Sequence, residues 1–409
     1  SWPVRDTATA RTRSPDRDWT VTGTQSHDCD ALVVGAGMIG SACALAPARE
    51  GLSAMLFDKH SAHQNALSGP QRVSAINQAS ENILRHLDVW TGIVASRPQP
   101  FERIEVWDAG NTGTISFDAA DMGLAHLGHI VRNDAISSAL HQALAAEPSV
   151  SLHFGDTPAA ITSSGSSIAV TLERGETISA RLLIGADGAR SKVRELADIT
   201  HQELAYNHTA IVATVTPDAP HESCARQRFL SSGPLAFLPL PNNECSIVWS
   251  AHTDRAEELL ALDDHAFSLE LANAFENRLG NIQKISARAG FPLVRRHAAD
   301  YIGDRIALVG DAAHTVHPLA GLGANQGFAD AAALTEVVTG AFSQNRDPAS
   351  RSVLRRYERW RRGENALVLK VMDGFHGLFS TQNPALSNLR GVGLDLTDRI
   401  PFIKEKFIR

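Results

Sequence analysis

The chain has 409 residues, of which 43% are hydrophobic and 20% are charged, so it is too long for one ordinary core and has the composition of a soluble globular protein. No stretch approaches 18 uncharged apolar residues, which excludes an apolar membrane-spanning helix. The formal net charge is −7, yet residues 351–409 contain 12 Lys or Arg against 6 Asp or Glu. This basic end indicates a surface that binds anionic lipid or an acidic partner; the alternative is a solvated helix face.

The N-terminal third predicts the start of a nucleotide-binding domain. Residues 1–28 are polar and lack apolar periodicity, which predicts a disordered leader. A buried strand at 31–35, a helix at 38–50 and a strand at 54–58 then form a βαβ unit. Further helices are expected at 77–87 and 135–146, and further strands at 103–107, 114–117, 168–172, 177–180 and 181–184.

Residues 200–300 have a different pattern. Strands are expected at 210–216, 226–229, 235–240 and 245–250, and a helix at 268–278. A buried strand at 306–309 and helices from residue 324 follow. The fold class predicted is α/β, with a Rossmann-like domain interleaved with a smaller β-sheet domain and a helical C-terminal end.

Three glycines form a Gly-x-Gly-x-x-Gly motif between the first strand and helix: Gly35, Gly37 and Gly40. The first allows a tight turn, the second lets the backbone approach a pyrophosphate, and the third lets helix and strand pack closely. Asp58 ends the second strand, where an acid can bind ribose hydroxyls. The pattern predicts a dinucleotide site; the alternative is a glycine-rich turn in an unrelated α/β protein.

A second motif, Gly310-Asp311, follows another buried strand. A carboxylate there can bind a ribityl chain, which only a flavin has, although Asp311 could instead cap the next helix. The sequence alone leaves these two readings open.

A glycine-rich run from Pro318 to Gly327 enters a helix. Unpaired N–H groups and the positive end of the helix dipole would stabilise negative charge there, as at the N1–C2 region of a reduced flavin. The alternative is an ordinary loop–helix junction.

These motifs, with the Asp187-Gly188 pair, resemble the fingerprints of the single-component (class A) FAD-dependent aromatic hydroxylases, typified by para-hydroxybenzoate hydroxylase. The chain is more similar still to the hydroxylases of ubiquinone biosynthesis. That similarity rests on the segments 72–77, 126–131, 236–240, 246–250 and 310–321, while 105–108 and 377–380 resemble the bacterial 2-polyprenylphenol 6-hydroxylases.

The resemblance implies a role for each matching residue. The ADP half of FAD would be held by Gly35, Gly37, Gly40 and Asp58, and the rest of the cofactor would be contacted by Arg72, Asn133, Asp187, Gly188, Gly310 and Asp311. The catalytic segment would comprise Pro318, Leu322 and Gly323, with the backbone amides of Ala324 and Asn325 facing N1 and O2 of the flavin. No metal ligands are expected.

Three positions depart from the family pattern. Arg132 stands where relatives usually have Glu, Leu322 replaces a usual Gln, and Gln326 replaces an apolar residue. We expect these departures to affect the coupling of cofactor oxidation to hydroxylation, or the substrate, more than the fold.

The motif positions also divide the chain. We expect a leader (1–28), three parts of an FAD-binding domain (29–100, 131–199 and 301–345), two parts of a substrate domain (101–130 and 200–300) and a C-terminal helical region (346–409).

The implied activity is monooxygenation. NADPH or NADH would reduce FAD, O2 would form a C4a-hydroperoxide, and one oxygen would pass to the ring of a polyprenylated phenol in ubiquinone biosynthesis. The alternatives are hydroxylation of another aromatic metabolite and a non-catalytic FAD-holding role in a quinone-biosynthesis complex.

Sequence also suggests a location. Four scattered cysteines fit a reducing compartment, so we expect a cytoplasmic protein that does not bind nucleic acid. The basic C-terminal end, including Arg355, Arg359, Arg361 and Arg362 on one helix, is expected to contact the inner membrane at its surface.

Overall fold

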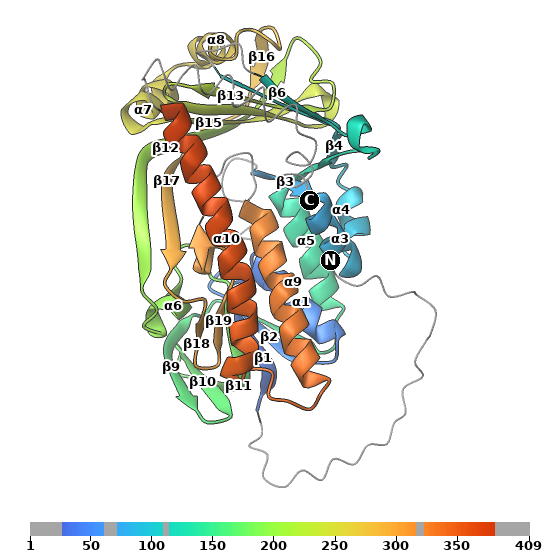
Figure 1. The fold of residues 1–409 in the computed structure, drawn as a ribbon, viewed down its shortest axis with the longest axis vertical. Coiled ribbons are helices and arrows are strands. Elements are labelled where there is room, and N and C mark those ends of the chain that lie inside the picture. Colours follow the sequence, from blue (N-terminus) through green and yellow to red (C-terminus); the bar gives the residue numbers. More distant parts are fainter. Residues whose placement is uncertain (1–26, 61–71, 109–113, 316–322, 381–409) are drawn as a thin grey trace.

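A computed structural model gives the fold (Figure 1) and describes residues 27–60, 72–108, 114–315 and 323–380, with side chains up to residue 366. Residues 1–26 of the expected leader, and Pro318 and Leu322 of the expected catalytic segment, lie outside the described residues.

The first sheet has eight strands and is parallel at its centre, where β1 pairs with β2 and β11, β2 with β8, and β11 with β19. Its order is β18-β19-β11-β1-β2-β8, and the antiparallel strands β10 and β9 extend it from β11. The central strands are apolar runs, as is typical of parallel strands that are buried on both faces. The bounds are β1 (Cys29–Val34), β2 (Ala54–Asp58), β8 (Val150–Phe154), β9 (Pro158–Ser164), β10 (Ser167–Leu172), β11 (Thr177–Gly185), β18 (Ile302–Gly303) and β19 (Ile306–Leu308).

Helices surround this sheet and share its core. α1 packs against α5 and α9, and α9 also contacts α10 and α3, so that the long helices α9 and α10 run side by side (Figure 1). One continuous buried cluster joins residues of β1, β11, α1, α5 and α9. The bounds are α1 (Met38–Arg49), α3 (Gln78–His86), α4 (Trp90–Val94), α5 (Asn133–Ala145), α6 (Lys192–Leu196), α9 (Gly323–Phe342) and α10 (Arg351–Ser380).

The second sheet has nine strands in the order β20-β17-β12-β15-β14-β13-β5-β6, with β16 paired to β12. Helices α7 and α8 cover its outer face (Figure 1), where Phe267 and Leu271 of α8 pack on Phe237 and Trp249. The bounds are β5 (Arg103–Asp108), β6 (Thr114–Asp118), β12 (His201–Pro217), β13 (Cys224–Leu230), β14 (Gly233–Pro239), β15 (Cys245–His252), β16 (Ile282–Ile285), β17 (Ala289–Ala298), β20 (His314–Thr315), α7 (Thr253–Ala261) and α8 (Asp264–Ala274).

A third sheet joins the two larger ones. Its order is β3-β7-β4, and a small cluster including Phe101, Ile130 and Leu238 lies between it and the second sheet. The bounds are β3 (Val73–Asn77), β4 (Gln99–Phe101) and β7 (Gly128–Arg132), with short 3-10 turns at Ala120–Met122, Pro241–Asn243 and Gly310–Ala312.

The architecture confirms the predicted α/β class with a β-rich second unit and a helical C-terminal part, while the domain boundaries stay a prediction. The helix expected at 268–278 is wrong in its bounds, because Asp263 caps α8 by accepting a hydrogen bond from the amide of Ala266. β12 begins at His201, earlier than the strand expected at 210–216. The sequence did not indicate this start because the first residues of β12 are polar and exposed and show no apolar alternation. Among the described residues no helix is long and apolar enough to cross a membrane.

Candidate functional site

The predicted motifs meet at one edge of the first sheet. Gly35 follows β1, Asp58 ends β2, Asp187 follows β11, and Asp311 follows β19. These four strands are parallel neighbours in the order β19-β11-β1-β2. Their carboxyl ends therefore lie together, the place where open α/β sheets bind nucleotides.

The glycine turn is shaped by close backbone contacts at two of its three glycines. Gly35 has φ +108°, and a Cβ there would lie 2.3 Å from the carbonyl oxygen of Ala186. A Cβ on Gly40 would lie 1.8 Å from the carbonyl oxygen of Gly35. Gly37 differs, since a Cβ there would have no protein atom within 4 Å. The turn thus leaves space beside Gly37, which suits the close approach of a phosphate.

Two side chains hold this turn from either side. The carboxylate of Asp58 accepts a hydrogen bond from the amide of Ala36 at 2.7 Å. Nε2 of His141, on α5, lies 2.8 Å from the carbonyl oxygen of Ala36. His141 escaped the sequence analysis because it is distant in the chain and forms no motif with the glycines.

The Asp187-Gly188 pair lies at the start of α6. One oxygen of Asp187 accepts from the amides of Lys192 and Val193 at 2.6 and 3.0 Å, while its other oxygen is buried without a partner among the described residues. Gly188 has φ +81° with open space where a Cβ would be. Asp187 thus caps α6 and keeps one acceptor free for a bound group.

Arg194, which the sequence analysis missed, ties this loop to the second motif. Its buried guanidinium donates to the carbonyl oxygens of Ala189 at 2.9 Å and Ala312 at 2.8 Å. The two motifs are therefore held at a fixed separation.

Asp311 is exposed and lies in a 3-10 turn whose N-cap is Val309. Among the described residues no group hydrogen-bonds to its carboxylate, which gives the capping alternative no support. The surrounding protein raises the pKa of Asp311 through desolvation, an effect opposed by the charges of His314, Arg72 and Arg296. The carboxylate is thus oriented by the short turn at Gly310 and remains able to accept hydrogen bonds.

Arg72 and Asn133 lie beside each other on the edge of the third sheet. The amide of Asn133 donates to the carbonyl oxygen of Arg72 at 2.9 Å, and Oδ1 of Asn133 accepts from Oγ of Ser74 at 2.8 Å. The guanidinium of Arg72 lies 5.6 Å from the ring centre of Phe291 on β17, so it reaches the second sheet. The unusual Arg132 is exposed and paired with Asp134 at 2.5 Å, which explains how the chain tolerates it.

The start of α9 presents backbone amides that have no acceptor within the helix. Gly323, Ala324 and Asn325 form its first turn, whose N–H groups have no partner within the helix. The side chain of Asn325 fixes this turn on β3, because it donates to the carbonyl oxygen of Ala75 at 2.7 Å and accepts from the amide of Asn77 at 3.1 Å.

A buried charge network lies directly behind the second motif. Asp330 of α9 is fully buried and accepts from the amide of Gly310 at 3.0 Å, from His314 at 2.5 Å and from Nε of Arg361 at 2.7 Å. Burial alone would raise the pKa of Asp330, but His314 and Arg361 hold it below its usual range. Asn365 of α10 also donates to Asp330 at 3.3 Å.

The network overturns one sequence expectation. Arg361 was grouped with the membrane-facing arginines, yet it is buried and paired with Asp330. The buried carboxylate of Asp330 needs such a partner because burial of an unpaired charge is costly. Arg361 also donates to Oε1 of Gln326 at 3.0 Å, which accounts for a polar residue at that position. His314 takes part in the same polar network through its contact with Asp330.

The donor set fits the ADP and ribityl parts of FAD. Space beside Gly37, the oxygen of Asp187 that has no partner among the described residues, and the first-turn amides of α9 are features that a bound flavin dinucleotide would use.

Known proteins are similar over nearly the whole chain. Residues 28–370 match the FAD binding domain family. The chain is 37% identical over 383 residues to the 3-demethoxyubiquinol 3-hydroxylase of Escherichia coli strain K12, covering 93% of this chain and 97% of that protein. It is 34% identical over 396 residues to ubiquinone hydroxylase UbiL of Rhodospirillum rubrum, covering 97% and 92%.

A solved structure shares the fold. The p-nitrophenol 4-monooxygenase PnpA from Pseudomonas putida DLL-E4 superposes with a TM-score of 0.75 over 93% of this chain and 96% of that one, at 18% identity. The chain therefore belongs to the FAD binding domain family and, within it, to the FAD-dependent monooxygenases of the ubiquinone-biosynthesis hydroxylase group.

Proposed function

We propose that this enzyme hydroxylates the aromatic ring of a polyprenylated phenol in ubiquinone biosynthesis. The observation that carries the proposal is the near full-length similarity to the 3-demethoxyubiquinol 3-hydroxylase and to the ubiquinone hydroxylase UbiL. The narrower likeness to 2-polyprenylphenol 6-hydroxylases stays a prediction.

Each predicted residue then has a physical task. Gly37 and the first turn of α1 would receive the pyrophosphate, and Asp58 the ribose. Asp311 would orient the ribityl chain. The first-turn amides of Ala324 and Asn325 would stabilise negative charge on the reduced ring. Bound FAD, reduced by NAD(P)H, supplies the activation of O2.

The second sheet would form the substrate wall. Arg72 and Phe291 approach each other between the third sheet and β17. Their contact would close one side of the site and exclude water from the reacting ring, which protects the activated oxygen from loss as peroxide.

We expect Asp311→Ala to weaken FAD binding at least tenfold. The change removes a hydrogen bond to a charged acceptor, worth about 1.5–3 kcal/mol. Fluorescence titration of the apoprotein with FAD measures the effect. Asp304→Ala, at an exposed position before β19, is the matched control and should bind FAD like the wild type. Equal FAD affinity in both variants would contradict the role of Asp311.

We also propose that α10 brings the enzyme to the membrane surface, where a polyprenylated substrate resides. The exposed side chains of Arg351, Arg355, Arg359 and Arg362 recur at helical spacing along α10, and Trp360 is 41% exposed among them. Each basic residue near anionic lipid contributes about 1 kcal/mol, and salt screens it.

Liposome flotation tests this surface. Binding should require anionic lipid, weaken with salt, and fall when Arg355, Arg359 and Arg362 become Gln. A control with three exposed arginines changed elsewhere (Arg97, Arg174 and Arg346 to Gln) should float like the wild type. Equal loss in both triple variants would mean that net charge alone drives binding, and no flotation of the wild type would exclude a membrane role for α10.

The experiment that tests the proposed function is mass spectrometry of the quinone intermediates that accumulate in cells lacking this protein. A prenylated ring that lacks one hydroxyl is expected. Unchanged quinone intermediates would favour another aromatic substrate. If a variant that retains FAD but does not oxidise NAD(P)H in response to a phenol still restores quinone synthesis, the chain acts as a non-catalytic component of a complex.

A further inference from the structure

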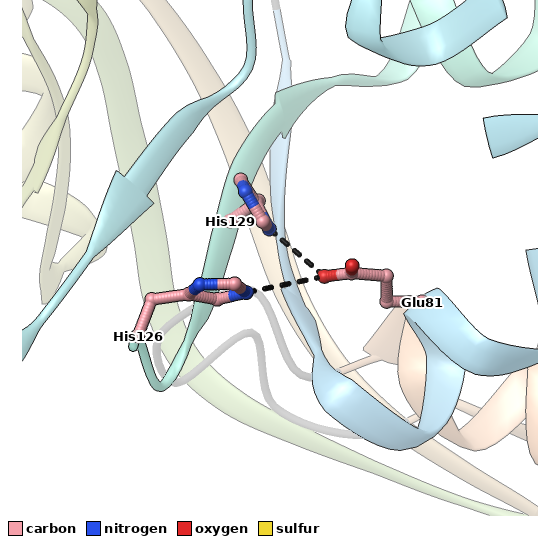
Figure 2. Close-up of side chains that lie close together, drawn as sticks. All are labelled: Glu81, His126 and His129. Carbon is pink, nitrogen blue, oxygen red and sulfur yellow. Dashed lines mark hydrogen bonds and ion pairs between the residues drawn. The ribbon is translucent and has the colours of Figure 1, made fainter. Parts of the chain in front are cut away.

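Three side chains outside the flavin site converge on one point. Glu81 of α3, His126 in the turn before β7, and His129 on β7 have potential ligand atoms within 4.8 Å of one another (Figure 2). We propose that Glu81, His126 and His129 form a binding site for a divalent transition-metal ion, with zinc preferred.

The donor types and distances suit zinc. Oε2 of Glu81 lies 2.9 Å from Nδ1 of His129 and 3.5 Å from Nε2 of His126. Two imidazoles and one carboxylate are a known protein ligand set for zinc, which leaves a fourth position for water. With metal–ligand bonds of about 2.0–2.2 Å, neighbouring donors in a tetrahedral site lie about 3.3 Å apart. The two distances from Glu81 to the histidines are already within a few tenths of an ångström of that spacing.

The surrounding residues hold the donors in place. Arg85 donates to the other oxygen, Oε1 of Glu81, at 2.9 and 2.6 Å, which turns Oε2 toward the histidines. Gln78 donates to the carbonyl oxygen of His126 at 3.0 Å, and Trp90 packs edge-on against His129 with ring centres 5.2 Å apart. Such outer contacts orient metal ligands and fix their rings.

The site is reachable from solvent. The side chains are 7% (Glu81), 14% (His129) and 26% (His126) exposed, so an ion from solvent can arrive past His126.

Among the residues that the structure describes, Arg85 places a positive charge next to Glu81 that opposes a cation. Its side chain is 55% exposed, so solvent and salt screen its charge, and its repulsion lowers the affinity without abolishing it. Removal of this charge should therefore strengthen metal binding, a result that a purely structural hydrogen-bond cluster does not predict.

A bound ion would brace the wall beside the flavin site. It would join α3 to β7, and β7 pairs with β3, whose Ala75 and Asn77 hold the Asn325 side chain of α9. The role inferred is structural, since nothing connects the three donors to the reacting ring.

Zinc titration of the chelator-treated, tag-free holoenzyme tests the proposal, followed by equilibrium dialysis with metal analysis and by thermal unfolding. One zinc per chain should bind and raise the Tm, whereas Mg²⁺, which prefers oxygen ligands, should not. His126→Ala and His129→Ala should each weaken zinc binding at least tenfold, and Arg85→Gln should strengthen it severalfold.

The control is His265→Ala, which removes an exposed histidine on α8 and should leave zinc binding unchanged. Zinc binding that persists at full stoichiometry in the His126→Ala/His129→Ala double variant would overturn the site. A folded, FAD-loaded wild type that takes up no zinc would overturn it as well, as would weaker binding in Arg85→Gln. None of these outcomes depends on catalytic activity.

Discussion

Replacement of Asp330 by alanine is expected to lower the free energy of unfolding by about 3–5 kcal/mol, because it leaves the buried cation of Arg361 without its partner. The amide of Gly310 and the ring of His314 lose the same acceptor. The turn that presents Asp311 should therefore loosen, and FAD content should fall together with the Tm. Thermal unfolding and the flavin absorbance of the purified protein measure both effects.

A double variant distinguishes the destabilisation caused by an unpaired Arg361 from the destabilisation caused by lost packing. Asp330→Leu with Arg361→Met removes both charges and keeps apolar volume, so it should recover much of the stability lost by Asp330→Ala. If the double variant is less stable than Asp330→Ala, the unpaired arginine is not the cause. A wild-type Tm for Asp330→Ala would show that the network contributes little.

Gly40→Ala and Gly37→Ala should behave in opposite ways. At Gly40 the new Cβ would lie 1.8 Å from the carbonyl oxygen of Gly35, which forces the turn apart and should cost about 3 kcal/mol or more, with loss of FAD binding. At Gly37 the backbone is extended, with φ −69°, and a Cβ meets no protein atom within 4 Å. Gly37→Ala should therefore keep the Tm of the apoprotein.

FAD affinity distinguishes a Gly37 that receives the pyrophosphate from a Gly37 that only forms part of a turn. If the open space beside it receives the pyrophosphate, Gly37→Ala should raise the FAD dissociation constant about tenfold or more, equivalent to about 1.4 kcal/mol. Titration of the apoprotein with FAD measures this change, and unfolding of the apoprotein is the internal control. Unchanged affinity would place the phosphates elsewhere.

The sequence predicted the elements whose pattern is local. The βαβ start and the strands near 103–117 have regular apolar patterns and clear ends, and the structure confirms them within a few residues. The first half of β12 was missed because it is polar and exposed, and β17 was missed because Pro292 and a basic second half interrupt its apolar pattern. The two segments are stabilised by pairing with each other, a non-local interaction with no signal in either segment. Helix α7 was missed for the same kind of reason, since its apolar face is short and mixed with acids.

In the site as well, residues in local motifs could be predicted and residues that act through non-local contacts could not. Motif residues such as Gly35 and Gly40 could be predicted because a turn demands glycine at those positions. His141 and Arg194 could not, since each acts on a backbone carbonyl brought near only by the fold. Arg361 shows the reverse error: its charge indicated a surface role, and only the structure reveals the buried Asp330 beside it. The three proposed zinc ligands likewise lie on α3, on β7 and in the turn before β7, and follow no spacing rule.

We propose that this chain transfers an oxygen atom from O2 to a prenylated aromatic ring with FAD as its cofactor. The most direct test is a reaction of the FAD-loaded enzyme with NAD(P)H, a short-chain polyprenylphenol and isotopically heavy O2, analysed by mass spectrometry. We expect a hydroxylated ring that carries one heavy oxygen atom, formed only when FAD, NAD(P)H and O2 are all present. A folded, FAD-loaded enzyme that leaves every prenylated phenol or quinol unlabelled, or a product whose new oxygen comes from water, would contradict it.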